Sequence, residues 1–474
     1  GGRSVHQPST LNHQPVLELV VAGGTVATAT DTYRADLGVR DGRIVQIGGE
    51  MPPAARTVDA RGKLVIPGGV DPHTHFDSRS QGTVTADDWL SGTVAAACGG
   101  TTTVVDMCFP EKGRGLKEGL DEWHRRASGK TLIDYGLHVT ILDERDEVFD
   151  EIPRCPEYGV PTLKLFMAYR STVMVSDAAL YRALAQAARF GGLVLVHAEN
   201  GDAVALRERA LVAAGDTAPA FHAAARPPRV EAEATARAIA LAELAGAGLY
   251  VVHVTCAEAI EEIIHGRARG VRVYAETCPQ YLFCSVEDLA RPEFEGAKYV
   301  CSPALRERWQ QEVLWRGLEN GTLQVLASDH SAFSFDDPNG KKRGLSDFRR
   351  IPNGVPGVEE RLMLAYQGVV NGKLSLGRFV DVVATAPARL HGLFPRKGTI
   401  AVGSDADLVV WDPEAELTLE QAGLHHRVDY TCYEGLRVRG VPATVIARGE
   451  VIVEGREPVG APGRGRFVPR SRAG

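Results

Sequence analysis

The sequence lacks three features that would assign it to a membrane or to a nucleic acid. No apolar run reaches the roughly 18 residues that a membrane-spanning helix requires. Positive charge is not in excess, because 53 lysines and arginines against 60 aspartates and glutamates give a formal net charge of −7, unlike the basic surface of a nucleic-acid-binding protein. The first residues contain no apolar stretch typical of a secretory signal. We therefore expect a cytoplasmic protein with neither a membrane nor a nucleic acid as partner.

Cysteine is also scarce. The eight cysteines among 474 residues include no Cys-x-x-Cys pair, which argues against a thiolate metal site and against a disulfide framework. We expect them to be reduced and buried, as small hydrophobic residues. What is present is the composition of an ordinary globular protein, 44% hydrophobic and 24% charged. A chain of this length predicts one large domain with a smaller appended layer.

Two stretches rich in short strands flank a central stretch with a different sequence pattern. Residues 16–66 and 397–460 alternate β-rich runs with tight turns, and we expect them to pair into one β-sandwich built from both ends of the chain. Residues 1–15 are polar and are expected to be disordered. Residues 461–474 form a basic tail, expected to be solvated, with a subunit contact as the alternative.

The central stretch, residues 67–396, alternates apolar strands with amphipathic helical segments. Eight such units predict an α/β fold, a (β/α)8 TIM barrel, in which the chemistry takes place at the C-terminal ends of the strands. The expected strands are residues 64–66, 102–107, 132–140, 162–166, 193–196, 250–252, 272–276 and 324–327.

Residues that can bind a metal interrupt or follow these strands. His73 and His75 come after the first apolar run, and residues i and i+2 of an extended strand face the same side. Strands four, five, six and eight carry corresponding residues: Lys164, His197, His253 and Asp329. A lone histidine at a strand end is more often a core residue than a ligand. Six nitrogen- or oxygen-bearing groups at one edge of a barrel instead indicate a metal centre.

Four histidines, one aspartate and no cysteine suit zinc, although manganese, cobalt or iron accept the same donors. Six groups are too many for one tetrahedral ion, and two ions about 3.5 to 4 Å apart would use them all if an anion bridged them. Lys164 is the candidate for that bridge. A buried lysine has a lowered pKa, and its neutral amine can add CO₂ to form a carbamate with one oxygen for each ion. The alternative is a lysine that extends from the strand end toward solvent.

The motifs around these residues resemble those of the cyclic amidohydrolases and, within them, the dihydropyrimidinases, also called D-hydantoinases. The resemblance covers residues 17–460 and includes stretches without any ligand, such as 294–300 and 395–407. The motifs are Pro-Gly-Gly-Val-Asp-Pro-His73-Thr-His75, Leu-Lys164-Leu-Phe-Met-Ala-Tyr169, Val-His197-Ala-Glu-Asn-Gly, Val-Val-His253-Val-Thr-Cys, Glu-Thr-Cys278-Pro-Gln-Tyr and Ser-Asp329-His.

The resemblance implies zinc-dependent hydrolysis of the cyclic amide bond of dihydropyrimidines and 5-substituted hydantoins to N-carbamoyl amino acids. It implies two Zn²⁺ ions per subunit, bridged by a hydroxide and by carbamylated Lys164. The more buried ion would be held by His73, His75 and Asp329, and the more exposed ion by His197 and His253. A homotetramer is implied as well.

The resemblance also implies roles in binding and catalysis. Asp329 would act as general base and then as general acid, and Tyr169 would stabilise the oxyanion. Ser302 and Asn353 would bind the cyclic amide, largely through backbone groups; either could instead be a plain turn residue.

The chain departs from the family pattern at residues 78–81, at Val173 and at Ser331-Ala332, where Cys-Pro is more usual. Many hydantoinases carry large apolar residues after the histidine pair, whereas residues 78–81 read Ser-Arg-Ser-Gln here. Val173 stands where an aromatic residue is common. We expect a more polar and roomier pocket mouth, which favours dihydrouracil and small or polar 5-substituted hydantoins over 5-phenylhydantoin.

Two other functions compete with this interpretation. An allantoinase would use the same metal ligands on another cyclic ureide, but allantoinases resemble this chain around the lysine and generally lack Tyr169. A non-catalytic scaffold relative would have lost metal ligands, and all six are present here.

Overall fold

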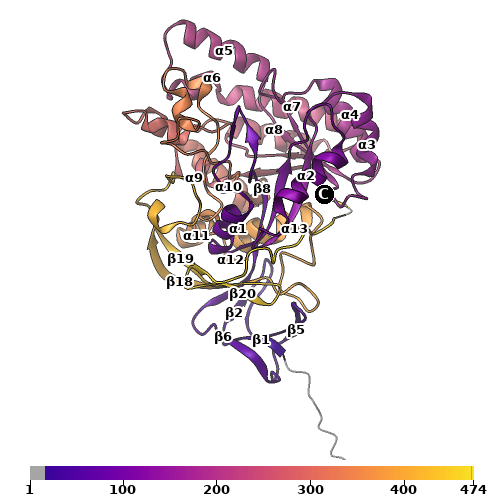
Figure 1. The fold of residues 1–474 in the computed structure, drawn as a ribbon, viewed down its shortest axis with the longest axis vertical. Helices are drawn as coiled ribbons and strands as arrows, with labels where there is room; N and C mark the ends of the chain where they lie inside the picture. The colour runs from indigo at the N-terminus through magenta and orange to yellow at the C-terminus, as the bar shows by residue number, and fades with distance from the viewer. Residues whose placement is uncertain (1–16, 471, 474) are drawn as a thin grey trace, which may run out of the picture.

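A computed structural model of the protein describes residues 17–470, 472 and 473 (Figure 1). The expected disordered segment 1–15 lies outside the described residues. A parallel barrel surrounded by helices forms the upper body in Figure 1, and β-strands from both ends of the chain form a second body beneath it. The predicted TIM barrel with an appended β-sandwich is therefore confirmed.

The barrel is an eight-stranded sheet in which every neighbouring pair is parallel and the spatial order follows the chain order. A bridge between Thr74 and His330 connects the first strand with the segment that follows the last one. The strands are β8 (Gly69–Thr74), β11 (Thr101–Cys108), β12 (Asp134–Thr140), β13 (Thr162–Phe166), β14 (Leu193–His197), β15 (Gly248–Val251), β16 (Val273–Thr277) and β17 (Val325–Leu326).

The first barrel strand differs from the one expected at residues 64–66, and that expectation was wrong. Those residues form β7 (Leu64–Pro67), which pairs with sandwich strands, and the barrel begins with β8. An apolar run marks a strand buried on both faces without saying in which sheet it lies. The true strand contains Asp71, Pro72 and His73 and therefore resembles a loop, yet Asp71 accepts hydrogen bonds from the backbone of His73 and Ser328 inside the barrel.

Helices cover the outside of the barrel. In α2 (Leu116–Ala127), Leu116, Leu120 and Trp123 share one buried face, as the helical period requires. The other helices are α1 (Trp89–Cys98), α3 (Asp146–Glu151), α4 (Asp177–Ala188), α5 (Gly201–Ala213), α6 (Phe221–Ala225), α7 (Pro228–Ala245), α8 (Ala257–Ala268), α9 (Pro279–Phe283), α10 (Trp309–Asn320), α11 (Arg361–Val370), α12 (Leu376–Val380) and α13 (Ala386–Leu390). No helix in the described ranges is both long and apolar enough to cross a membrane.

The second body joins two sheets around a separate apolar core that includes Leu19, Val39, Val65, Leu408 and Ile446. A four-stranded sheet has the order β5-β4-β1-β6 and a seven-stranded sheet the order β21-β20-β19-β18-β7-β2-β3. The strands are β1 (Leu17–Ala22), β2 (Thr25–Ala27), β3 (Thr32–Arg34), β4 (Leu37–Arg40), β5 (Arg43–Ile47), β6 (Ala54–Asp59), β18 (Leu408–Thr418), β19 (Arg437–Ala447), β20 (Glu450–Glu454) and β21 (Glu457–Pro458). The proposed domain limits, 16–66, 67–396, 397–460 and 461–474, stay a prediction.

Part of the basic tail is packed on the barrel, so the expectation of a solvated tail was wrong for Val468 and Arg470, whereas Arg466 and Arg472 are exposed. The backbone of Tyr135 in β12 donates to Arg466 and accepts from Val468. The Arg470 side chain is buried and donates to the carbonyl of His391. Apolar Phe467 and Val468 give the tail a face to bury, which a count of its charges does not reveal. The eight cysteines are free and buried, as expected.

Candidate active site

A cavity of about 510 Å³ lies at the C-terminal ends of the barrel strands. All nine residues selected from the sequence line it: His73, His75, Lys164, Tyr169, His197, His253, Ser302, Asp329 and Asn353. These residues come from five strands or the loops after them and from two longer connecting segments. The barrel therefore brings together groups that lie as far as 280 positions apart in the sequence.

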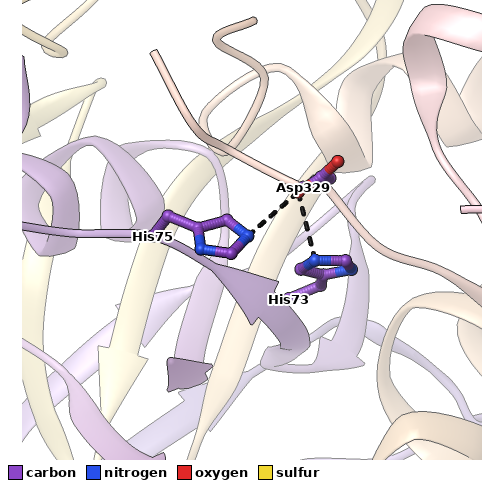
Figure 2. Close-up of side chains that lie close together, drawn as sticks. All are labelled: His73, His75 and Asp329. Carbon is purple, nitrogen blue, oxygen red and sulfur yellow. Dashed lines mark ion pairs between the residues drawn. The ribbon is translucent and has the colours of Figure 1, made fainter. Parts of the chain in front are cut away.

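Three of these side chains converge on one point, as Figure 2 shows. The Nε2 atoms of His73 and His75 lie 3.1 and 3.2 Å from the same oxygen of Asp329. Their candidate ligand atoms are all within 4.8 Å of one another. Burial lowers the pKa of His75 to about 4, so this imidazole is neutral at pH 7, which is the form that binds metal.

Glu276 orients the first of these histidines. It lies in β16, and its carboxylate is hydrogen-bonded to Nδ1 of His73, accepts from the backbone N–H of His253 at 3.3 Å and from the Tyr250 hydroxyl at 2.8 Å. With Nδ1 engaged, Nε2 of His73 is left to face Asp329, which is the arrangement of a carboxylate behind a metal-binding histidine. Glu276 was not among the residues predicted from the sequence, although an acidic residue at the end of an expected strand was a usable signal.

The other two histidines form a second pair beside the first. The rings of His197 and His253 have centroids 4.6 Å apart, and His253 lies 5.6 Å from His73. Nε2 of His197 lies 2.6 Å from Glu199, which in turn accepts from Arg226 at 2.7 Å. Nδ1 of His253 is buried without a hydrogen-bond partner in the part of the chain that is described. This nitrogen is therefore free to accept a hydrogen bond from water or to bind an ion.

Lys164 lies in β13 among these groups and is 1% exposed. Burial lowers the pKa of its amine to about 8, against the opposing effect of the Asp329 and Glu276 carboxylates. The expectation of a buried lysine with a lowered pKa is met, and the alternative of a lysine reaching solvent is excluded. Its neutral form is accessible near neutral pH.

Three residues of the site have left-handed backbone conformations that side chains with a Cβ disfavour. The φ angles are 41° at His253, 47° at Asp329 and 67° at Tyr169. Each such conformation costs about 1 to 3 kcal/mol and persists only where the surroundings impose it. The chain therefore turns sharply as it leaves β13, β15 and β17. The residue at each of these turns has a side chain that lines the cavity.

Tyr169 follows β13 and lies against His197, with ring centroids 5.2 Å apart. Burial raises the pKa of its phenol to about 12, although Arg226, Ser302 and Asn353 act in the opposite direction. Arg226 lies 5.5 Å from the ring centroid. The phenol is therefore protonated at neutral pH and is available as a hydrogen-bond donor.

The main-chain N–H and carbonyl of Asn353 lie on the cavity side. The side-chain amide of Gln81 is hydrogen-bonded to both of them. The backbone N–H of Asn353 donates to Gln81 Oε1 at 2.7 Å, and its carbonyl accepts from Gln81 Nε2 at 3.0 Å. Gln81 lies between β9 (Arg79–Ser80) and β10 (Thr83–Val84) and lines the cavity too. This backbone edge is thus complementary to an amide group. Nothing in the sequence pairs these residues, which are 272 positions apart.

The mouth of the cavity is polar where the sequence departs from the family pattern. Ser78, Arg79, Ser80, Gln81, Thr172 and Val173 form part of the wall. Next to them the cavity continues along α2, where Arg126 stacks on Trp123 and pairs with Glu122 at 3.0 Å. Phe109, Leu142 and Phe166 supply the apolar part. The expected polar character of the mouth agrees with this lining.

Comparisons with known proteins add to this geometry. The model of the Amidohydrolase family matches residues 64–452. The D-hydantoinase of Rhizobium radiobacter is 52% identical over 456 residues, which are 96% of this chain and 99% of that protein. A solved D-hydantoinase structure, 52% identical, has a TM-score of 0.95 over 96% of this chain and 99% of its own. The dihydropyrimidinase of Brevibacillus agri NCHU1002, 46% identical, has a TM-score of 0.94 with the same coverage. The resemblance found in the motifs is therefore confirmed: the chain belongs to the amidohydrolase family, among the D-hydantoinases and dihydropyrimidinases.

Proposed function

We propose that the protein hydrolyses the cyclic amide bond of dihydropyrimidines and 5-substituted hydantoins and releases N-carbamoyl amino acids. The observation that carries the proposal is the meeting of a metal-binding group, a buried lysine, a protonated phenol and an amide-complementary backbone edge in one cavity. The similarity to D-hydantoinases and a dihydropyrimidinase over nearly the whole chain supports the same reaction.

The residues fit two divalent metal ions. His73, His75 and Asp329 would hold one ion, and His197 and His253 the other, with carbamylated Lys164 between them. The donor set of imidazoles and a carboxylate suits zinc, and the unpartnered Nδ1 of His253 is consistent with a ligand there. When bound, two such ions lower the pKa of a shared water toward neutrality and polarise the carbonyl of the substrate.

The protein's own groups would hold the ring and move protons. Asp329 would accept the proton of the attacking water and return it to the leaving ring nitrogen. The Tyr169 hydroxyl would donate to the carbonyl oxygen as it becomes an oxyanion. Ser302 and the main chain of Asn353 would bind the ring amide in the place where Gln81 lies in this structure.

The direct test is to assay the purified protein with dihydrouracil, hydantoin, 5-substituted hydantoins and allantoin, and to measure the metal content of each sample as purified. We expect ring opening of the first three kinds of substrate and about two zinc ions per chain. A sample with two ions that opens none of these rings would overturn the proposal. Opening of allantoin alone would establish the allantoinase alternative, and purification without stoichiometric metal would favour a scaffold.

A homotetramer and a cytoplasmic location belong to the proposal as well, supported by family membership and by the sequence composition. Light scattering at micromolar concentration measures the assembly directly. A mass equal to the 50.9 kDa chain would contradict the tetramer.

A further inference from the structure

Lys341 is a second fully buried lysine, and the proposed reaction makes no use of it. It begins a short 3-10 turn, Lys341–Gly344, and has no exposed surface. A buried lysine is rare unless it is paired, and no ion pair to Lys341 occurs within the described ranges. Its ammonium donates instead to three backbone carbonyls, those of Val300 at 2.8 Å and of Pro352 and Gly354 at 2.7 Å each.

The three carbonyls belong to the two segments that carry the proposed ring-binding residues. Val300 lies two residues before Ser302, and Pro352 and Gly354 flank Asn353. The backbone N–H of Gly354 also donates to the carbonyl of Val300 at 3.0 Å, so the two segments touch directly beside the ammonium. An ammonium has three N–H donors, and all three connect these segments.

The hydrogen bonds of residues 352–354 link this contact to the cavity. The carbonyls of Pro352 and Gly354 accept from Lys341. The N–H and the carbonyl of Asn353, which lies between them, have a different partner. Both meet Gln81, a residue of the cavity wall, whereas Lys341 does not line the cavity.

We propose that Lys341 is a positioning residue for binding of the cyclic amide: its ammonium fixes the distance between the Ser302 segment and the Asn353 segment and turns the Asn353 main chain toward the substrate. This inference rests on the proposed function of Ser302 and Asn353. A neutral, apolar side chain in this place would leave the buried carbonyls of Pro352 and Gly354 without a donor. The two segments would then be joined here by the single hydrogen bond from Gly354 to Val300.

Lys397 offers a matched control. It is also almost fully buried, at 1% exposure, and its ammonium contacts three acceptors: Asp134 at 2.7 Å, Asp405 at 3.0 Å and Asp407 at 2.8 Å. These contacts join β12 to the chain that leads into the sandwich strand β18, and Lys397 is not part of the cavity wall. Its loss removes a buried lysine with the same number of partners and leaves the two ring-binding segments in place.

The experiment compares Lys341→Met with Lys397→Met in steady-state hydrolysis of dihydrouracil, with metal content and melting temperature measured on the same samples. We expect Lys341→Met to keep its metal and to raise KM about tenfold or more with a much smaller change in kcat, because the reacting groups remain while the ring is held less well. We expect Lys397→Met to lower the melting temperature and to leave KM unchanged. An unchanged KM in folded Lys341→Met, or an equal rise in KM in the control, would overturn the proposal.

If Lys341→Met does not yield folded protein, Lys341→Arg against Lys397→Arg decides. A planar guanidinium cannot donate to three carbonyls that converge on one atom, so KM is again expected to rise for Lys341→Arg alone; an unchanged KM would overturn the proposal. If the unmodified enzyme opens no cyclic amide, both the proposed function and this inference are refuted. An active parent with a normal KM in the Lys341 variant would sink only the inference.

Discussion

The floor and the rim of the cavity are built in different ways. The floor consists of side chains in or directly after barrel strands, such as His73, Lys164 and His197, and each strand is fixed by its neighbours in the sheet. The rim consists of loops that are fixed by a few specific contacts, such as Gln81 with Asn353 and Lys341 with three carbonyls. Under the proposed function, the floor would carry out the chemistry, while the rim would determine which ring is held and how firmly.

The largest effect on the floor is expected from the loss of Lys164, which lies at its centre. We expect Lys164→Ala to lose most of its metal and about 10³-fold or more of its turnover, because the proposed bridge disappears and with it the source of a nucleophile at neutral pH. Metal analysis and initial rates measure both effects, and a short carboxylic acid added to the buffer should restore part of each. Two retained zinc ions with full turnover would refute the bridge.

Tyr169 joins the floor to the rim and should affect turnover without affecting metal. We expect Tyr169→Phe to fold, to bind both ions and to lose about 10²-fold in kcat, the usual effect of removing one oxyanion donor. The measurement is kcat at saturating dihydrouracil with metal content as the control. A rate within twofold of the parent would remove the phenol from the mechanism.

Glu276 supports the floor from behind, so its loss should appear in metal affinity. We expect Glu276→Gln to weaken zinc binding about 10- to 100-fold, because His73 then lacks the carboxylate that fixes its ring. Titration with a competing chelator measures the affinity, and Glu261→Gln, an exposed change in α8, is the control. Equal affinities in the two variants would show that Glu276 does not orient the ligand.

The rim should set the choice of substrate. Burial of a phenyl ring against apolar walls contributes about 1.5 to 3 kcal/mol, and much of this is lost at a mouth lined by Arg79 and Ser80 with Val173 in place of an aromatic residue. We expect a higher kcat/KM for dihydrouracil than for 5-phenylhydantoin, and a shift toward the aryl substrate of about tenfold in Val173→Phe. A parent that prefers 5-phenylhydantoin by tenfold or more contradicts this account.

The smallest expected effect concerns the hairpin between β9 and β10. We expect Gln81→Ala to lower KM about threefold, because the substrate no longer displaces a carboxamide from Asn353 and each such hydrogen bond contributes about 0.5 to 1.5 kcal/mol. KM for hydantoin measures the effect, with Ser80→Ala as the control. A higher KM in Gln81→Ala would mean that the side chain helps to hold the ring.

The difference between floor and rim also explains what the sequence could predict. The strand at 162–166 was predicted with its observed bounds, and its lysine lies where the pattern placed it, because strands and their ends leave a local signal. Lys341 lies in the run Gly-Lys-Lys-Arg, which resembles an ordinary solvated stretch. Only the closure of residues 300 and 352–354 around it reveals its role, and such contacts between distant segments have no local trace.

The same reasoning accounts for the misplaced first strand. Residues 64–66 carried the apolar signal, while β8 contains a glycine, an aspartate and a proline and has no apolar run. Within the barrel, the Asp71 carboxylate accepts a hydrogen bond from the backbone of Ser328 and pairs with Arg361. Both partners lie more than 250 positions later in the sequence. A buried strand with polar residues can therefore be recognised in a sequence only once the partners of those residues are known.

The direct passage from β7 into β8 has a consequence for how the protein can be divided. Only Gly68 separates the two strands, and a Cβ atom there would lie 2.1 Å from the Thr102 hydroxyl, so the chain has room for no other residue. One continuous segment thus begins as the sandwich strand β7 and ends as the barrel strand β8, which contains His73. The two bodies are consequently not modules that can be exchanged between relatives at this junction. A replacement of the sandwich that changed the position of β7 in its sheet would also shift β8 and displace the imidazole of His73.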